Sequence, residues 1–357
     1  IDTLRSVRYP GNGKNLVEAG MVEDDIRIDG DSVSFSLVFD KPTDPFIKSM
    51  AKAAETAIHT YISPEVKVTV NVASRQPAAP KDAPVLPGVK NIIGVSSGKG
   101  GVGKSTVASN LAVALAQEGY KVGLLDADIF GPSMPKMFGI EDEQLYIHEV
   151  DGRQLIIPQE RYGVKLLSIG FVVDKEKAVL WRGSMASNAL KQLITDADWG
   201  DLDYFLIDMP PGTSDIHLTL VQTLPITGVV VVTTPQEVAL ADARKGIAMF
   251  REDKVNVPIL GLVENMAWFT PAEHPDERYY IFGREGGVRL AEKLGVRLLA
   301  QIPLVASIAD CGDNGTPIAL DGSVTAQAFA HLAREVSDAV AERNRELPPT
   351  HKVELKH

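Results

Sequence analysis

Cysteine is almost absent from this sequence, because Cys311 is the only one among 357 residues. A single cysteine excludes an intrachain disulfide framework and is typical of proteins that work in a reducing compartment such as the cytoplasm. The seven histidines show no spacing typical of zinc ligands. We therefore expect a cytoplasmic protein that is stabilised neither by disulfides nor by a dedicated zinc site.

Long hydrophobic runs and an excess of positive charge are also missing. No stretch of 18 or more apolar residues occurs, and the residues after Ile1 show no basic segment followed by an apolar signal core. The formal net charge is −11, which argues against a broad surface for binding nucleic acid. We therefore expect no transmembrane helix and neither membrane nor nucleic acid as a partner.

Proline is concentrated in one segment, "ASRQPAAPKDAPVLPGVKN", over residues 73–91. Proline lacks an amide donor and disfavours helix in the residue before it, which indicates an extended, semi-rigid linker. A disordered insertion is the alternative, but the residue pattern changes across the segment, which favours a linker. The predicted organisation is a first domain over 1–72, a linker over 73–90, a second domain over 91–347 and a C-terminal tail over 348–357.

The residues before the linker predict a small α+β domain with the order helix, strand, strand, helix, strand. "DDIRI" and "SVSFSLVF" flank the turn sequence "DGDS", which indicates a hairpin. Apolar residues have helical spacing from Pro45 onward, and "VKVTVNV" alternates as a strand does. No catalytic constellation is visible, and Asp40 and Asp44 are interpreted as turn residues.

The residues after the linker predict a doubly wound α/β domain with a mostly parallel sheet. Most of its apolar runs are continuous, as expected for strands that are buried on both faces. Between the strands lie helical patterns such as Ser105–Glu118, which Gly119 closes. Ligands bind such sheets at the carboxyl ends of the strands. The predicted strands are Asn91–Ser96, Lys121–Asp126, Val164–Ile169, Asp203–Asp208, Gly228–Thr233, Ile259–Glu264 and Leu298–Ile302.

A glycine-rich loop joins the first of these strands to a helix. The sequence from Gly98 to Ser105, "GKGGVGKS", matches the P-loop pattern G-x-x-x-x-G-K-[ST]. Glycines let the backbone N–H groups line a cradle for phosphate oxygens, and the helix adds the positive end of its dipole. Lys104 can reach the β- and γ-phosphates, while the Ser105 hydroxyl can ligate Mg²⁺. The strand and helix around the loop favour this interpretation over a merely flexible turn.

Acidic residues end two further strands. Asp208 closes "FLIDMPPG" and is the expected Walker-B acid that positions Mg²⁺, and the Pro-Pro-Gly after it would shape a loop able to sense the γ-phosphate. Asp126 and Asp128 close "GLLDADIFGPS", where a carboxylate could orient the attacking water or the metal shell. Each acid alone would more often be a strand-terminating cap. Together with the P-loop they predict a nucleotide-hydrolysing site.

A second lysine, Lys99, stands at the start of the loop. We expect it to point away from Lys104. It then serves the nucleotide of a partner subunit, as an arginine finger does in trans, or it is an ordinary solvated loop lysine.

The string "KGGVGKST" resembles the deviant Walker A motif of the ParA/MinD-type ATPases. Within that superfamily, "LLDADIFGPSMP", "DYFLIDMPPGTSDIHLTL", "TTPQEVALADARKG" and "ENM" resemble the Mrp/ApbC group of iron–sulfur cluster carrier ATPases. The first domain, through "VRYPGNGKNLVEAGMVEDDIRIDG", is similar to the small iron–sulfur assembly domain that precedes the ATPase in many bacterial Mrp proteins. The resemblance covers nearly the whole chain.

The resemblance implies a homodimer that binds ATP and Mg²⁺, hydrolyses ATP slowly, and passes a [4Fe–4S] cluster held between its subunits to apo-proteins. It implies catalytic roles for Lys99, which contacts nucleotide across the dimer, for Lys104, and for Asp128, the switch acid near the hydrolytic water. Ser105 and Asp208 would hold Mg²⁺. The implied nucleotide-binding residues are Gly98, Lys99, Gly100, Gly101, Val102, Gly103, Lys104, Ser105, Thr106 and, at the adenine, Asn265.

One expected motif is missing. Family members that carry a cluster usually have a C-x-x-C pair after "ENM", but this chain has "AWFTPAEHPDERYYI" there, without cysteine. Related first domains often carry Cys-Pro where this chain has Asp44-Pro45. A cubane ordinarily takes four thiolates, and a homodimer of this chain has two, both Cys311. Cys311 is either one iron ligand per subunit, completed by His274, Asp276 or a small thiol, or an ordinary packing residue.

The segment that replaces the cysteine pair is rich in aromatic residues between Trp268 and Tyr280. These side chains could cover an apolar dimer seam, take a protein partner, or pack under a loop.

The leading hypothesis is an Mrp-like ATPase in iron–sulfur protein maturation that acts as carrier, scaffold or accessory factor, with apo iron–sulfur proteins or assembly factors as partners. One alternative is a ParA/MinD-like spatial-organising ATPase that binds DNA or membrane. The candidate membrane helix, Gln327–Glu346, has three arginines against four acids, which is the wrong sign for anionic lipid. Another alternative is a nucleotide-dependent binding module with little turnover.

Overall fold

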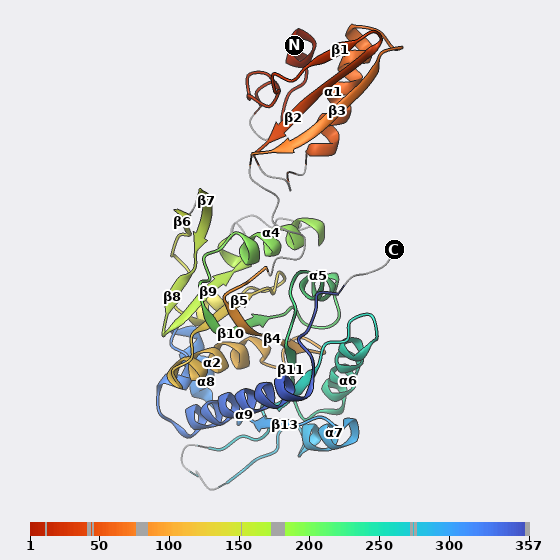
Figure 1. Cartoon of the computed structure of the whole chain (residues 1–357). Helices are drawn as coiled ribbons and strands as arrows, with labels where there is room; N and C mark the ends of the chain where they lie inside the picture. The colour runs from red at the N-terminus through yellow and green to blue at the C-terminus, as the bar shows by residue number, and fades with distance from the viewer. Residues whose placement is uncertain are drawn as a thin grey trace. The chain divides into compact units, whose positions relative to one another are not determined.

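The computed structural model describes residues 1–10, 13–40, 44, 46–75, 85–150, 152–172, 183–271, 274 and 277–353. The chain forms two compact units, Ile1–Ala83 and Pro84–His357 (Figure 1). Half of the predicted linker, residues 76–84, lies outside the described residues.

The first unit is a three-stranded sheet covered by one helix. Strand β1 pairs antiparallel with β2, and β2 pairs in parallel with β3 after the chain crosses over through α1. The apolar face of α1, including Met50 and Ala54, packs against Phe35, Leu37 and Phe39 of the sheet. The predicted hairpin, helix and last strand are confirmed, and the first predicted helix is a short 3-10 helix, η1. The elements are η1 Asp2–Ser6, β1 Arg27–Asp29, β2 Ser32–Phe39, α1 Ile47–Tyr61 and β3 Lys67–Ser74.

The second unit is built on an eight-stranded sheet with the order β13-β12-β11-β4-β10-β5-β9-β8. Neighbouring strands run parallel except β8, which pairs antiparallel with β9 at one edge. The predicted mostly parallel sheet is confirmed, and all seven predicted strands are present with ends shifted by two residues or fewer. The strands are β4 Val89–Ser97, β5 Val122–Asp126, β8 Gln159–Arg161, β9 Val164–Ser168, β10 Leu202–Asp208, β11 Gly228–Thr233, β12 Ile259–Glu264 and β13 Leu298–Gln301.

Helices cover both faces of this sheet (Figure 1). One face carries α2 Lys104–Gln117, α3 Met134–Met137, α8 Ala306–Asp313, η3 Ile318–Leu320 and α9 Val324–Glu346. The other carries α4 Gly183–Thr195, α5 Asp215–Thr223, α6 Glu237–Arg251 and α7 Gly286–Leu294. A short turn, η2 Ile169–Phe171, follows β9, and a separate hairpin, β6 Tyr146–Val150 and β7 Arg153–Ile157, was not predicted.

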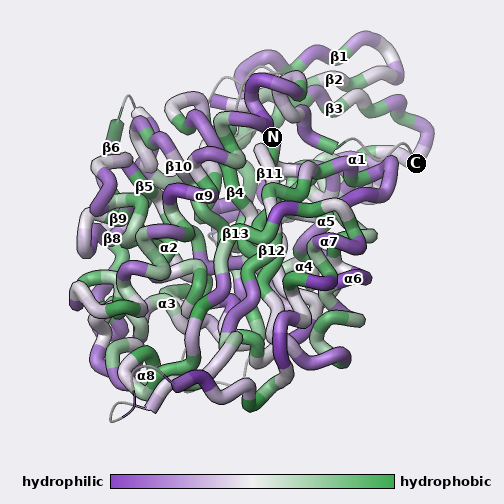
Figure 2. The backbone as a smooth tube through the Cα atoms, turned by 90° about the horizontal axis from the view of Figure 1, so that it is seen from below, coloured by the Kyte–Doolittle hydropathy of each residue, from purple (hydrophilic) through white to green (hydrophobic). Residues whose placement is uncertain are grey.

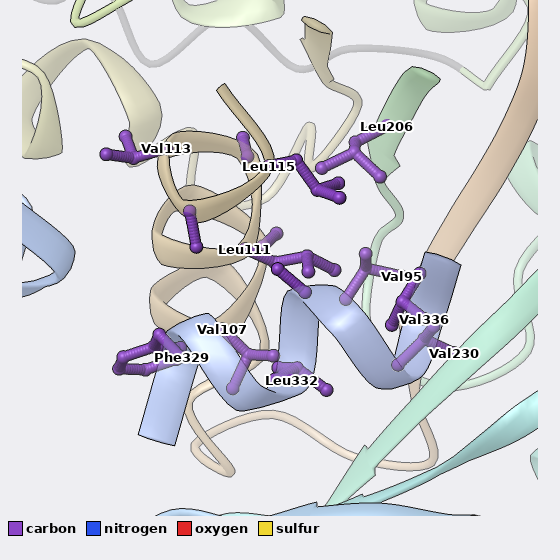
Figure 3. Packing of buried hydrophobic residues seen from close by; sticks show 14 of the residues in the cluster. Val95, Val107, Leu111, Val113, Leu115, Leu206, Val230, Phe329, Leu332 and Val336 are labelled. Atoms are coloured by element: carbon purple, nitrogen blue, oxygen red, sulfur yellow. The ribbon is translucent and has the colours of Figure 1, made fainter. Parts of the chain in front are cut away.

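Alternation along the central strands explains why the predicted runs are continuously apolar. Successive strand residues point to opposite faces, so Leu124 and Leu206 enter one core while Leu125 and Ile207 enter the other. In Figure 2, β11 and β12 are coloured mainly green, which marks hydrophobic residues. Figure 3 shows side chains of α2 and α9 meeting over the strands, with Leu111 close to the sheet. Two apolar cores therefore hold the strand ends in a fixed register.

Within the described part of the chain, no helix has both the length and the apolar character needed to span a membrane.

Candidate functional site

The P-loop connects β4 to α2 at the carboxyl end of the sheet, as predicted. Gly101 and Gly103 have φ values of 82° and 80°, in the left-handed region that favours glycine. A Cβ atom on Gly103 would lie 2.2 Å from Asn265 Nδ2, and one on Gly98 would lie 2.1 Å from the backbone of Asp242. These glycines therefore serve both the turn of the loop and its close packing against neighbouring segments.

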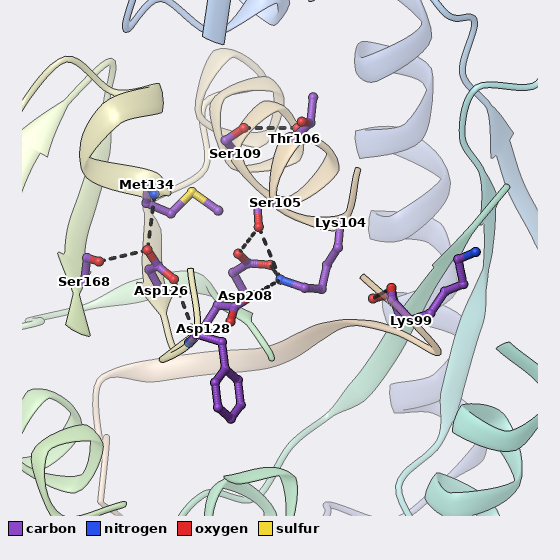
Figure 4. A network of polar contacts seen from close by, with 12 residues as sticks. Lys99, Lys104, Ser105, Thr106, Ser109, Asp126, Asp128, Met134, Ser168 and Asp208 are labelled. Carbon is purple, nitrogen blue, oxygen red and sulfur yellow. Dashed lines mark hydrogen bonds and ion pairs between the residues drawn. The ribbon is translucent and has the colours of Figure 1, made fainter. Parts of the chain in front are cut away.

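Lys104, the first residue of α2, lies among the predicted acids. Its side chain is 6% exposed, and its Nζ atom lies 2.6 Å from Asp208 Oδ1 and 3.4 Å from Asp128 Oδ2. The Ser105 hydroxyl donates to Asp208 Oδ2 at 2.6 Å (Figure 4). Three strand ends meet here because β10 lies between β4 and β5. The structure therefore brings together four of the residues that the sequence singled out.

The electrostatics of this cluster suit a phosphate-bound cation. Asp208 is fully buried, and burial raises the pKa of its carboxyl group, while the Lys104 ammonium opposes that rise. Two carboxylates face a single ammonium group, and the Ser105 hydroxyl adds a third oxygen ligand. Mg²⁺ prefers such oxygen ligands and usually binds one or two carboxylates together with substrate phosphates. The residues present thus fit the predicted Mg²⁺.

Asp126 makes different contacts from Asp128, which follows it two residues later. Its carboxylate accepts hydrogen bonds from Ser168 Oγ at 2.8 Å and from the backbone N–H groups of Asp128 and Met134 at 3.2 Å. Burial, with the nearby charge of Asp208, raises the pKa of Asp126 to about 7. Because the protein's own donors take up its oxygens, Asp126 orders the loop that presents Asp128 and does not itself face Lys104. Ser168, the last residue of β9, was not predicted as part of the site.

His217 was also not predicted. It lies in the first turn of α5, and its Nδ1 accepts the backbone N–H of Ser214 at 3.2 Å, which closes a capping box after the Pro-Pro-Gly loop. The residue is 1% exposed, and burial lowers its pKa to about 4, with the Lys104 charge adding to the effect. Its Nε2 atom is buried without a hydrogen-bond partner among the described residues. His217 therefore ties α5 to the end of the Asp208 loop as a neutral imidazole.

Lys99 and Asn265 lie next to the P-loop but outside the Lys104 cluster. Figure 4 shows the Lys99 side chain pointing away from Lys104, as expected from the sequence. Asn265, directly after β12, donates from Nδ2 to the carbonyl oxygen of Val102 at 2.8 Å. Its backbone N–H donates to Thr233 at the end of β11. Asn265 is thus in contact with the P-loop, whereas Lys99 is directed out of the Lys104 cluster.

Cys311 lies far along the chain in α8, away from the P-loop motifs in sequence. Cys311 is half-buried and packs against the apolar core to which α2 and α9 contribute. Burial raises the pKa of its thiol. The Nδ1 atom of His274 lies 3.6 Å from Oε1 of Glu277, and Asp276 is outside the described residues. Among the residues that the structure describes, no group of three or more His, Cys, Asp or Glu side chains is arranged to hold a metal ion.

The described part of the aromatic segment follows β12 and is held in place by backbone pairing. Phe269 pairs with Tyr279 and with Leu304 as isolated β-bridges, so the segment is fixed at its base. The Arg278 guanidinium lies 4.2 Å from the centroid of the Trp268 ring, a favourable cation–π distance. Ring stacking and backbone pairing therefore hold the described part of the segment where a C-x-x-C pair was expected.

Comparison with known proteins covers both units. A family model described as an iron–sulfur cluster assembly protein matches residues 1–72, and one described as a NUBPL iron-transfer P-loop NTPase matches residues 88–337. An iron–sulfur cluster carrier protein from Synechocystis sp. is 42% identical over 344 residues, which are 96% of this chain and 97% of the relative.

Two solved structures extend the comparison to nucleotide-bound proteins. A nucleotide-binding protein from Archaeoglobus fulgidus in complex with ADP is 38% identical, with a TM-score of 0.56 over 64% of this chain and 88% of its own. The septum site-determining protein MinD from Pyrococcus horikoshii, complexed with Mg-ADP, is 25% identical, with a TM-score of 0.52 over 71% of this chain and 99% of its own.

These similarities favour the leading hypothesis over the spatial-organising alternative. The carrier protein matches both units of the chain, whereas the MinD structure matches 71% of it at lower identity. The P-loop NTPase match and the nucleotide-bound neighbours support nucleotide hydrolysis in general. The chain therefore belongs to the NUBPL iron-transfer P-loop NTPase family, in the Mrp/ApbC group of iron–sulfur cluster carriers that its motifs indicate.

Proposed function

We propose that this protein is a cytoplasmic, slowly hydrolysing ATPase that assembles iron–sulfur clusters or transfers them to apo-proteins, and that it works as a nucleotide-switched homodimer. The assembly domain spans residues 1–72 and is joined by the linker 73–90 to the ATPase domain 91–347, which the tail 348–357 follows. The observation that carries the ATPase part is the buried contact of Lys104 with Asp208 and Asp128, next to the Ser105 hydroxyl.

The P-loop residues bind and orient the nucleotide. Backbone N–H groups from Gly98 to Thr106 and the amino end of α2 receive the phosphates, while Asn265 contacts the adenine. Phosphate oxygens compete with Asp128 and Asp208 for the Lys104 ammonium, so that binding changes the partners of both carboxylates. Ser105 and Asp208 would hold Mg²⁺, which would supply positive charge at the phosphates.

The residues around Asp128 make the site a switch. Asp128 orients the attacking water, and Asp126 holds the Asp128 loop through backbone N–H groups. His217 holds the end of the Asp208 loop from the other side. Lys99 reaches the nucleotide of the partner subunit and stabilises charge that develops on its phosphates. Loops that respond to one γ-phosphate convert hydrolysis into a change between two dimer arrangements.

The iron–sulfur cluster is the cargo of this protein, and its ligands differ from the usual four thiolates. Two Cys311 thiolates per homodimer are half of what a cubane ordinarily takes. The cluster is held by Cys311 with His274, Asp276 or small thiols, or it is handled by partner assembly factors while this protein supplies the ATP-driven step.

The test is anaerobic reconstitution of the full chain with iron and sulfide, followed by transfer to an apo-enzyme that needs a [4Fe–4S] cluster. Wild type, Cys311→Ser and Lys104→Ala are compared for bound iron, absorbance near 400 nm, ATP hydrolysis and activation of the apo-enzyme. About four irons per dimer in wild type, lost in Cys311→Ser, assigns direct carriage.

Activation that depends on Lys104 but not on Cys311 assigns the accessory role. Wild type that neither hydrolyses ATP nor speeds activation over a protein-free control would contradict the proposed function.

A further inference from the structure

A groove lies at the amino ends of β4, β11 and β12, at the opposite edge of the sheet from the P-loop. It consists of two cavities of about 620 and 460 Å³, both lined by the C-terminal segment after α9. Both cavities are bordered by Arg343, Leu347, Pro349 and Thr350, so they adjoin along this segment. Their volumes are within the range of small-molecule sites in proteins.

Arg343 is the charged group that the two cavities share. Its Nη2 donates to the Pro348 carbonyl oxygen at 2.7 Å and to Thr350 Oγ1 at 2.8 Å, and its Nη1 donates to Asn344 Oδ1 at 3.1 Å. All three acceptors are uncharged. Its Nε atom is buried and has no hydrogen-bond partner within the described chain. The protein thus anchors this guanidinium without neutralising it, and burial lowers the pKa of Arg343 accordingly.

The lining of the larger cavity is basic in a chain whose net charge is −11. Lys254 and Lys352 line it together with Arg343, and Asp253 is the one acid among the described lining residues. In the smaller cavity Lys90 is already paired with Asp203 at 2.8 Å. The unneutralised charge is therefore concentrated around the larger cavity.

The remaining lining is apolar. Val255, Leu347 and Val353 border the larger cavity, as do Pro258 and Pro348. The backbone N–H of Val353 donates to the carbonyl oxygen of Val221 in the last turn of α5, which fixes the segment that carries this wall. An occupant that satisfies both kinds of lining has an anionic group and an apolar body.

We propose that the larger cavity binds a small organic anion whose carboxylate or phosphate group pairs with Arg343 and whose apolar part lies against Leu347 and the adjacent prolines. Anchoring of the C-terminal segment accounts for the two bonds of Nη2. It does not account for the two lysines beside the cavity, or for a guanidinium that has no carboxylate partner among the described residues. The site is separate from the P-loop and does not depend on the proposed function.

The test uses the full chain saturated with Mg²⁺ and ADP, so that the P-loop is occupied. Phenyl phosphate, phenylacetate and benzyl alcohol are titrated and followed by ligand-detected NMR and calorimetry. At least one of the two anions binds, and the uncharged alcohol does not. Binding by phenyl phosphate alone assigns a phosphate ligand, and binding by phenylacetate alone assigns a carboxylate ligand.

Variants decide whether Arg343 is responsible. Arg343→Gln weakens binding of the anion about tenfold, because a charge-assisted pair is lost. Arg345→Gln, an exposed arginine on the same helix, changes it less than about twofold and is the matched control. If Arg343→Gln fails to fold, Lys352→Gln decides, with about threefold weaker binding expected. No binding of either anion, or equal binding by wild type and both cavity variants, overturns the proposal.

Discussion

The two ends of the central sheet differ in how their charged side chains are paired. At the carboxyl end, Lys104 is buried against Asp208 and Asp128, and the Ser105 hydroxyl donates to Asp208. At the amino end, Arg343, Lys254 and Lys352 line the larger cavity, and among the described residues none of the three is paired with a carboxylate. The first end is a compensated cluster that a ligand must rearrange, and the second is an uncompensated one that a ligand would complete.

This difference indicates which mutations should lower the stability of the protein most. Removing one partner of a buried ion pair leaves a charge that water cannot reach, whereas removing an exposed charge leaves water in its place. The pairs Lys104–Asp208 and Lys90–Asp203 make the contrast measurable, because both lysines come from the same stretch of chain and their pair distances are 2.6 and 2.8 Å.

The largest effect is expected from Lys104→Ala. The variant loses nucleotide affinity by at least about a hundredfold, because the phosphates lose a charge-assisted donor. It also unfolds more easily by about 3 kcal/mol, since Asp208 is left buried without its cation. Binding is measured with a fluorescent ATP analogue and stability by urea denaturation.

Lys90→Ala is the matched control for Lys104→Ala, because the Lys90 side chain is 75% exposed. It is expected to leave both binding and stability unchanged. Tight nucleotide binding by Lys104→Ala would refute the P-loop assignment.

Lys99→Ala is expected to separate binding from hydrolysis. Because its side chain points away from Lys104, nucleotide affinity stays within about twofold, while turnover falls by about a hundredfold or more if the lysine acts across the dimer. Turnover is measured as a function of protein concentration. Unchanged hydrolysis by the variant at every concentration would rule out the role in trans.

His217→Gln tests how a buried neutral imidazole shapes the pH dependence of stability. The pKa of His217 is about 4 in the folded protein against 6.5 in the unfolded chain. Below pH 6.5 the unfolded chain therefore binds a proton that the folded protein refuses, and stability is lost as the pH falls toward 4. Relative to the variant, wild type should lose about 3 kcal/mol of unfolding free energy between pH 7 and pH 4.

The difference between wild type and His217→Gln is the quantity to follow. Asp126 has a folded pKa of about 7 against 3.8 unfolded, so its contribution to stability increases over nearly the same fall in pH and masks that of His217 in wild type alone. Parallel pH curves for the two proteins would show that folding leaves the pKa of His217 at its unfolded value.

The smallest effect is expected from Cys311→Ser. Cys311 lies in α8, outside the Lys104 cluster, so ATP hydrolysis should stay within about twofold of wild type and stability within about 1 kcal/mol. Steady-state hydrolysis and thermal unfolding measure both. A large loss of hydrolysis would mean that α8 is coupled to the nucleotide site.

Much of this molecule could be predicted from its sequence, because continuous apolar runs and a P-loop are local signals. The strands β11 and β12 were predicted with the bounds that the structure has. The edge strand β8 was missed because "QER" has no apolar signal, and the β6–β7 hairpin was missed because its residues are mostly exposed.

The site was predictable only as far as its motifs extend. Lys104, Ser105 and Asp208 belong to local patterns and lie together as expected. Ser168 takes part because β9 lies beside β5, and a single sequence does not state that order. His217 takes part through a local capping box with Ser214, but its pattern S-x-x-H differs from the usual S-x-x-E or S-x-x-Q signature. Asp126 and Asp128 looked equivalent until the hydrogen bonds of Asp126 were known.

The two outermost strands, β8 and β13, are the shortest of the central sheet, with three and four residues. A chain that tried to add itself as a further strand would find few free backbone groups, and at β8 it would meet the charged side chains of Glu160 and Arg161. The sheet is thereby closed to growth at its edges, which protects the protein from strand-by-strand aggregation. In the proposed homodimer a second copy would then be contacted through loops or helices, among them the loops that carry Lys99 and the exposed Phe130.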